Sequence, residues 1–152
     1  GELDGIDLDS IKEYNKENNT NYDELSFKEF TQVYHVSSEI QKIVKPFKEH
    51  IGRSHLLMLA KGGYFPPHRD LPVYVEEQNS LRILVPLMGC NPPDLYFMYE
   101  DKPLHFDHGR AYFLNTNKSH SLFSMRGSLM IVLNVKANEE VYKIIGDHFQ
   151  TT

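Results

Sequence analysis

The sequence predicts a mainly β domain, either an antiparallel sandwich or a barrel, with helices packed outside it. From residue 55 onward, apolar residues occur in short β-rich runs, and turn clusters such as GCNPPD, EDKP and NTNK separate these runs. Helical patterns lie before and after this region. Many short strands at close spacing, with helices ahead of them in the chain, are typical of this architecture.

The clearest helical pattern is SSEIQKIVKPFKEHIG, at 37–52, where apolar residues follow the spacing i, i+3, i+4, i+7. These residues are Ile40, Ile43, Val44 and Phe47. Ser38 and Gln41 have the spacing of a capping box, and Gly52 is expected to end the helix. Pro46 should kink or loosen it, because a proline inside a helix deletes one backbone hydrogen bond.

Two other helices and one loop are predicted outside the β region. A short helix is expected at 9–17 with Asp9 as its N-cap, and a closing helix at 138–149 capped by Asn138. The polar run NKENNTNYDE, at 15–24, is predicted to be a loop.

Six strands are predicted between these helices. They lie at 55–60, 81–87, 95–100, 110–115, 120–124 and 129–135. The length of 152 residues is enough for one domain with a sizeable core. We therefore expect a single domain over 1–152, with helical N-terminal support (1–54), a β core (55–136) and a C-terminal helix (137–152).

The composition limits the partners that this chain is expected to have. Its formal net charge of −5 argues against a nucleic-acid backbone as the main partner, because such proteins usually carry a basic surface. The apolar runs are far too short to cross a membrane. A single cysteine, Cys90, excludes an internal disulfide and fits a reducing compartment, so we expect a cytoplasmic protein.

The segment GGYFPPHRDLP, at 62–72, has the features of a rigid approach to two metal ligands. In an extended backbone, residues two apart project from the same face, so His68 and Asp70 can point at one ion. Pro66 and Pro67 restrict the backbone just before them, and the two glycines permit a tight entry turn. The combination of imidazole, carboxylate and open coordination positions suits non-haem Fe(II).

A third ligand has to come from elsewhere in the chain, and several candidates compete. His105 and Asp107 form a second HxD pair, and His108 or His120 could complete either pair. We favour His120 with the first pair, because the intervening segment holds three predicted strands, enough to cross a sandwich and return. The alternative is that there is no metal site: an HxD pair occurs by chance in many proteins, and His120 is then an ordinary histidine on a hairpin.

The order of these motifs resembles a known family. LLMLAKGGYFPPHRD, then LRILVPL, then GRAYFLNTNKSHS and SLMIVLNV, are similar to the core of the 2-oxoglutarate/Fe(II)-dependent dioxygenases. The likeness is to their aspartyl/asparaginyl hydroxylase-like and prolyl hydroxylase-like branches, and it covers about 55–136. It implies a double-stranded β-helix, a cupin-like jelly roll, with flanking N-terminal and C-terminal helices, which agrees with the predicted strands.

The resemblance also implies roles for particular residues. His68, Asp70 and His120 match the family's metal-binding facial triad, which would be the catalytic centre. Arg82 matches an arginine that helps to hold the co-substrate carboxylate. Arg126, in the predicted MRGS turn, is a second candidate for the same purpose, because an arginine pairs with a carboxylate through two parallel hydrogen bonds.

The expected function is an Fe(II)- and 2-oxoglutarate-dependent dioxygenase that hydroxylates a peptide side chain or a small molecule and releases succinate and CO2. The expected partners are the small-molecule co-substrate and a peptide or protein substrate, without nucleic acid or membrane. Loop 70–80 is expected to shape the substrate entrance. One alternative is a cupin-like jelly roll that binds a metal or small molecule without oxygenase activity. Another is a β-sandwich interaction domain in which the triad residues do not converge.

Overall fold

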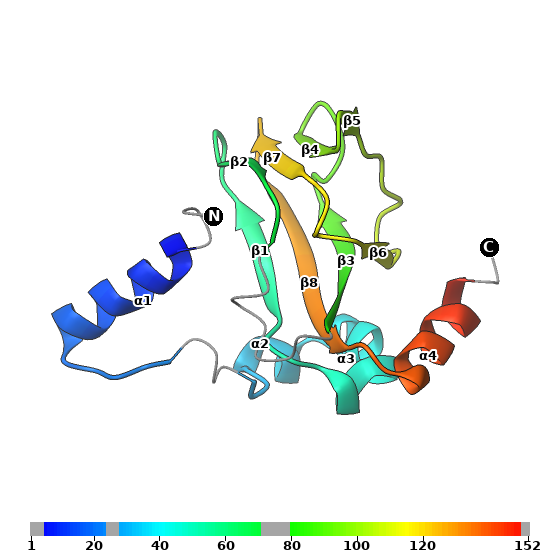
Figure 1. Cartoon of the computed structure of the whole chain (residues 1–152), viewed down its shortest axis with the longest axis horizontal. Helices are drawn as coiled ribbons and strands as arrows, with labels where there is room; N and C mark the ends of the chain where they lie inside the picture. The colour runs from blue at the N-terminus through cyan, green and yellow to red at the C-terminus, as the bar shows by residue number, and fades with distance from the viewer. Residues whose placement is uncertain (1–4, 24–27, 71–79, 150–152) are drawn as a thin grey trace.

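A computed structural model describes residues 5–23, 28–70 and 80–149 of the chain. Its centre consists of two antiparallel four-stranded sheets (Figure 1). Sheet A has the order β1 (His55–Leu59), β8 (Ser128–Lys136), β3 (Ser80–Met88) and β6 (Tyr112–Leu114). Sheet B has the order β2 (Tyr64–His68), β7 (His120–Ser124), β4 (Leu95–Tyr99) and β5 (Lys102–Pro103).

The strand pairing identifies the architecture as a jelly roll. The first strand pairs with the last, β2 pairs with β7, β3 with β6, and β4 with β5. The chain therefore runs as a long antiparallel ribbon folded over on itself, and successive pairs alternate between the two sheets. Eight strands wound in this way form the double-sheet jelly roll. The predicted fold class is confirmed.

Helices lie on both sides of the β region in sequence, as expected. They are α1 (Gly5–Asn18), α2 (Gln32–Val36), α3 (Ser38–Val44), the 3-10 helix η3 (Lys45–His50) and α4 (Glu139–Phe149). Figure 1 shows α2, α3 and α4 gathered near one end of β3 and β8, whereas α1 stands apart. Among the described residues, no helix is both long enough and apolar enough to cross a membrane.

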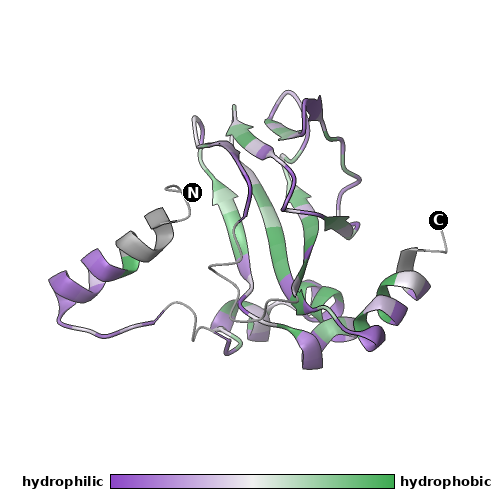
Figure 2. Ribbon diagram, viewed as in Figure 1, coloured by the Kyte–Doolittle hydropathy of each residue, from purple (hydrophilic) through white to green (hydrophobic). Residues whose placement is uncertain are grey.

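The two faces of sheet A bury two separate hydrophobic clusters. Between the sheets lie Leu59, Leu84, Cys90, Leu95, Phe97, Phe106, Leu114, Leu122, Met130 and Val132. On the outer face, the helices pack against strands through Val44, Phe47, Ile83, Val85, Ile131, Leu133, Val135 and Val141. Because both faces are covered, β3 and β8 read as continuous apolar runs rather than alternating ones. Figure 2 shows this hydrophobic colour on β1, β3 and β8, and a mostly hydrophilic colour on the coloured part of α1.

The helix predicted at 37–52 is divided in the structure. The α-helical part ends at Val44, and the next six residues form the 3-10 helix, with Pro46 near its start. This follows from the missing N–H of proline, which cannot continue the α-helical hydrogen bonding. The cap is one residue earlier than predicted, since the Oγ of Ser37 accepts from the Ile40 N–H at 3.3 Å.

Other boundaries differ modestly from the sequence predictions. The first helix begins at Gly5 and continues to Asn18, into the run predicted as a loop. The closing helix has the predicted cap, with the Val141 N–H donating to Asn138 Oδ1 at 2.9 Å. Strand β2, with two prolines, was not predicted as a strand. It lies at the edge of sheet B, where a strand tolerates residues without an N–H.

Candidate metal centre

Antiparallel pairing of β2 and β7 brings two of the predicted ligands together. His68, at the end of β2, is the register partner of His120, at the start of β7. Their ring centroids lie 4.3 Å apart. Side chains alternate along β7, so that His120 faces the sandwich interior with Leu122 while Phe123 faces outward. The strand register therefore positions both imidazoles at one end of the space between the sheets.

Asp70 completes the cluster from the segment that follows β2. Its backbone N–H donates to the Thr116 carbonyl at 2.9 Å, which fixes the chain after His68. The Oδ1 atom of Asp70 lies 3.5 Å from His68 Nε2 and 3.7 Å from His120 Nε2. The three potential ligand atoms all lie within 4.8 Å of one another. In the described part of the chain, this is the only group of three or more such side chains at this spacing.

The hydrogen bonds of the two histidines determine which ring nitrogen faces the centre. The Nδ1 of His68 donates to the Pro66 carbonyl at 2.7 Å, and the Nδ1 of His120 donates to the Lys118 carbonyl at 2.9 Å. A carbonyl oxygen only accepts, so the proton of a neutral ring lies on Nδ1 in both cases. Each Nε2 then presents a lone pair towards Asp70, which is the tautomer that metal-binding histidines use.

Burial and neighbouring charges favour the metal-binding protonation states. Burial lowers the pKa of His120 because it disfavours the imidazolium form, although the Lys118 carbonyl and Asp70 oppose this effect. Burial alone would raise the pKa of Asp70, but the neighbouring His68, Arg82 and His120 outweigh it and lower the pKa. At neutral pH, the site thus offers an ionised carboxylate and a neutral buried imidazole.

The donor set fits a divalent transition metal. Two imidazoles and one carboxylate suit first-row metals, and three protein ligands leave further coordination positions open. The side chains of His68 and Asp70 are 13% and 19% exposed, whereas that of His120 is 5% exposed. The ligands are thus held within the fold, and His120 is the most deeply buried of the three.

Arg82 lies beside this cluster and contacts one of its ligands, Asp70. On β3, it is the register partner of Leu114 on β6 and of Asn134 on β8. Its Nη1 donates to the Oδ2 of Asp70, and its Nε donates to the Oδ1 of Asn134 at 3.2 Å. The carboxylate partner of this arginine is thus Asp70, and its expected role towards a co-substrate stays a prediction.

Arg126 is not brought to the cluster. It lies in the turn between β7 and β8, at the opposite end of β7 from His120. Its side chain is 73% exposed, and its Nη1 lies 3.2 Å from the Oδ1 of Asp94. The structure therefore separates the two arginines that the sequence grouped together.

The competing HxD pair lies in the connection between β5 and β6, away from any strand end that carries the triad. His105, Asp107 and His108 are all exposed. Asp107 pairs with Arg110 at 3.3 Å. These residues do not join the His68 cluster.

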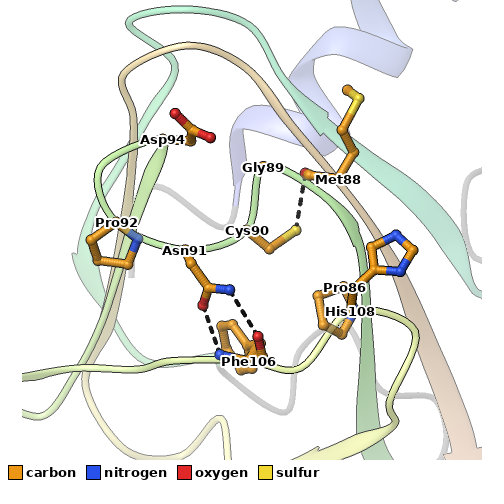
Figure 3. Close-up of a pocket in the computed structure, with 9 residues that line it drawn as sticks. All are labelled: Pro86, Met88, Gly89, Cys90, Asn91, Pro92, Asp94, Phe106 and His108. Carbon is orange, nitrogen blue, oxygen red and sulfur yellow. Dashed lines mark hydrogen bonds between the residues drawn. The ribbon is translucent and has the colours of Figure 1, made fainter.

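A cavity of about 210 Å³ lies at the other end of the sandwich (Figure 3). It is lined by Pro86, Met88, Gly89, Cys90, Asn91, Pro92, Asp94, Phe106 and His108. The Sγ of Cys90 donates to the carbonyls of Met88 and Leu129, and burial raises the pKa of this thiol. A protonated, hydrogen-bonded thiol is a poor nucleophile, so we do not expect Cys90 to act as one.

Sequence reasoning missed Asn134 as part of the site. This residue interrupts the apolar run LMIVLNV of β8, and a polar residue in a strand buried on both faces requires hydrogen-bond partners. That requirement is the signal that could have identified it. The loop at 70–80 that was expected to shape the entrance lies, apart from its two end residues, outside the described residues.

The fold and site together define a jelly-roll domain with a candidate two-histidine, one-carboxylate metal centre. No protein-family model matches the chain, and no curated protein matches it. Solved structures with some likeness include a predicted oxalate decarboxylase from Thermotoga maritima, with 14% identity and a TM-score of 0.42 over 61% of this chain and 73% of that chain. KdgF from Halomonas sp. has 15% identity and a TM-score of 0.42 over 60% of this chain and 74% of that chain. A cupin 2 conserved barrel domain protein from Salinispora arenicola has 13% identity and a TM-score of 0.39 over 62% of this chain and 71% of that chain.

Proposed function

We propose that this chain is a metal-dependent jelly-roll domain whose ion is held by His68, Asp70 and His120. The observation that carries the proposal is the arrangement of their lone pairs. Both Nδ1 protons are engaged by backbone carbonyls, and both Nε2 atoms face the same carboxylate oxygen at 3.5 and 3.7 Å. When both imidazoles are neutral, they and the carboxylate offer only acceptors in this direction, so a cation between them is the natural partner.

Fe(II) is the ion that we propose. Two histidines and one carboxylate with adjacent open positions form the donor set of non-haem Fe(II) oxygenases. The same donors also bind Co(II), Ni(II) and Zn(II), so affinity alone does not select iron. The proposal names the ion that the protein uses in the cell. In this proposal the protein holds three ligands and leaves the remaining coordination positions of the ion to other groups.

We further propose that the domain uses this ion as a 2-oxoglutarate-dependent hydroxylase. With Fe(II) bound, the centre would couple conversion of 2-oxoglutarate and dioxygen into succinate and CO2 to insertion of one oxygen atom into a C–H bond. Support comes from the three-ligand site and from the similarity of the motif order to such enzymes. The side chain of Arg82 is 27% exposed, and its guanidinium is the group we propose for the far carboxylate.

A second candidate function is a jelly roll that binds a metal ion or small molecule without oxygenase activity. One observation favours it specifically. Arg82 already pairs with Asp70 and Asn134, and Arg126 pairs with Asp94 at the other end of β7. Neither of the two arginines expected to clamp a co-substrate carboxylate is thus presented without a partner.

Anaerobic titration distinguishes these two functions. The full chain is loaded with Fe(II) and titrated with 2-oxoglutarate, and the visible charge-transfer band of a chelated keto acid is recorded. The oxygenase proposal expects a saturable band in the wild type and in His105→Ala, which alters the competing HxD pair. It expects no band in His68→Ala. Fe(II) binding by folded wild type without any band would favour the second candidate.

A further inference from the structure

The carboxylate of Asp70 has its two oxygens directed to different partners. Oδ1 faces His68 and His120, whereas Oδ2 accepts a hydrogen bond from Arg82 Nη1. A carboxylate can bind a metal ion through one oxygen or through both. Because the two oxygens have different partners, we infer, resting on the proposed metal site, that Arg82 and Asn134 are positioning residues. They keep Asp70 bound to the metal ion through one oxygen only.

Arg82 is suited to this task because it is itself held at two points. Its Nε donates to the Oδ1 of Asn134 at 3.2 Å, while Nη1 reaches Asp70. The guanidinium is planar and rigid, so two hydrogen bonds in different directions determine its orientation. Arg82 and Asn134 are also register partners on β3 and β8, the two central strands of sheet A.

Asn134 is in turn anchored to the segment that joins the helical layer to β1. Its backbone N–H donates to the Oγ of Ser54 at 2.9 Å, and its carbonyl accepts from the Gly52 N–H at 2.7 Å. Its side-chain Nδ2 donates to the carbonyl of Arg53. The contacts run from this segment through Asn134 and Arg82 to Asp70, and a metal ligand held by such a chain keeps one rotamer.

The charge of Arg82 helps to keep Asp70 ionised, but it does not favour a cation at the site. A guanidinium beside Asp70 repels a divalent cation and partly neutralises the carboxylate. Apart from this help to ionisation, any benefit to metal binding must come from orientation. The expected change in metal affinity follows from this. If Arg82 positions Asp70, its removal weakens metal binding, although the removal also takes away a repulsive charge.

Titration of the metal-free full chain with Co(II) tests the inference, because the visible absorption of Co(II) reports its coordination number and geometry. In Arg82→Met, the affinity should fall about 10- to 100-fold, and the absorption band should change because Oδ2 becomes free to bind. Arg82→Lys keeps the charge and a donor group but lacks the planar guanidinium whose fixed donor directions join Asp70 to Asn134, so its affinity should fall between those of Arg82→Met and the wild type.

Two further variants keep the test decisive. Asn134→Ala removes the support of Arg82 but not its contact with Asp70, so it should change the spectrum in the same direction and to a smaller extent. Arg110→Met is the matched control, because it breaks another arginine–aspartate pair, with Asp107 at 3.3 Å, outside the site. Its affinity and spectrum should equal those of the wild type.

The outcomes separate this inference from the function on which it rests. Wild-type affinity and spectrum in folded Arg82→Met and Asn134→Ala would overturn the positioning role and leave the metal site standing. If Arg82→Met does not fold, Asn134→Ala alone decides. Failure of the folded wild type to bind Co(II) through His68 and His120 would instead overturn the metal site itself.

Discussion

His68 and His120 are register partners on neighbouring antiparallel strands, and each donates its Nδ1–H to the carbonyl of a residue two positions earlier. The two histidines are thus held in the same way, one by its own strand and the other by the turn before its strand. This shared local geometry turns both Nε2 atoms towards Asp70. A metal site formed in this way depends on the register of β2 against β7.

Loss of either histidine should abolish tight metal binding. In His120→Ala, only His68 and Asp70 remain, and the affinity for Co(II) should fall by more than the roughly 100-fold that supporting residues alone account for. Isothermal titration calorimetry measures this change. The control is His108→Ala, an exposed histidine outside the cluster. Equal affinities in the two variants would contradict the site.

Metal binding should stabilise the fold, because the ligands converge only in the native state. A free Co(II) concentration 100 times the Kd should increase the free energy of unfolding by about 2.7 kcal/mol. Urea denaturation with and without chelator gives this difference. His120→Ala should show almost none of it, and an increase in that variant equal to the wild type would place the ion elsewhere.

The metal-free protein should lose stability in mildly acid solution through His120. Because burial lowers the pKa of His120 in the folded protein below its ordinary value of 6.5, its contribution to stability is complete above pH 6.5 and is lost as pH falls through the folded pKa. The pKa of Asp70 is also lowered, so Asp70 contributes a further loss of stability as pH falls below its ordinary value of 3.8. Urea midpoints at pH 7.5 and 5.5 for wild type and His120→Gln measure the first effect. Parallel pH profiles would show that His120 does not contribute.

Phe97 should matter for stability more than an outward-facing phenylalanine of the same sheet. It is 2% exposed, and its ring stacks on His120 with a centroid distance of 6.3 Å. Phe97→Leu should therefore destabilise the fold by about 1–3 kcal/mol, whereas Phe123→Leu should change it by about 0.5 kcal/mol or less. Phe123 is 41% exposed on the outer face. Thermal denaturation of both variants checks the difference, and equal losses would contradict this account of the core.

Local sequence patterns were sufficient for much of the fold. The strands at 120–124 and 95–99 lie within one residue of their predicted ends, because period and turn residues act locally. Strand β2 was missed because its two prolines argue against a strand, and only its place at a sheet edge permits them. The helix at 37–52 was divided because Pro46 lacks the N–H that α-helical bonding needs.

The sequence by itself determined that His68 and Asp70 share one face of an extended segment, because that relation depends only on backbone geometry over three residues. It also indicated that His120 could return beside them. Only the tertiary structure decided which partner Arg82 has and that Arg126 lies elsewhere, because those contacts depend on the register between strands distant in sequence. A shift of one residue in such a register turns every side chain to the opposite face.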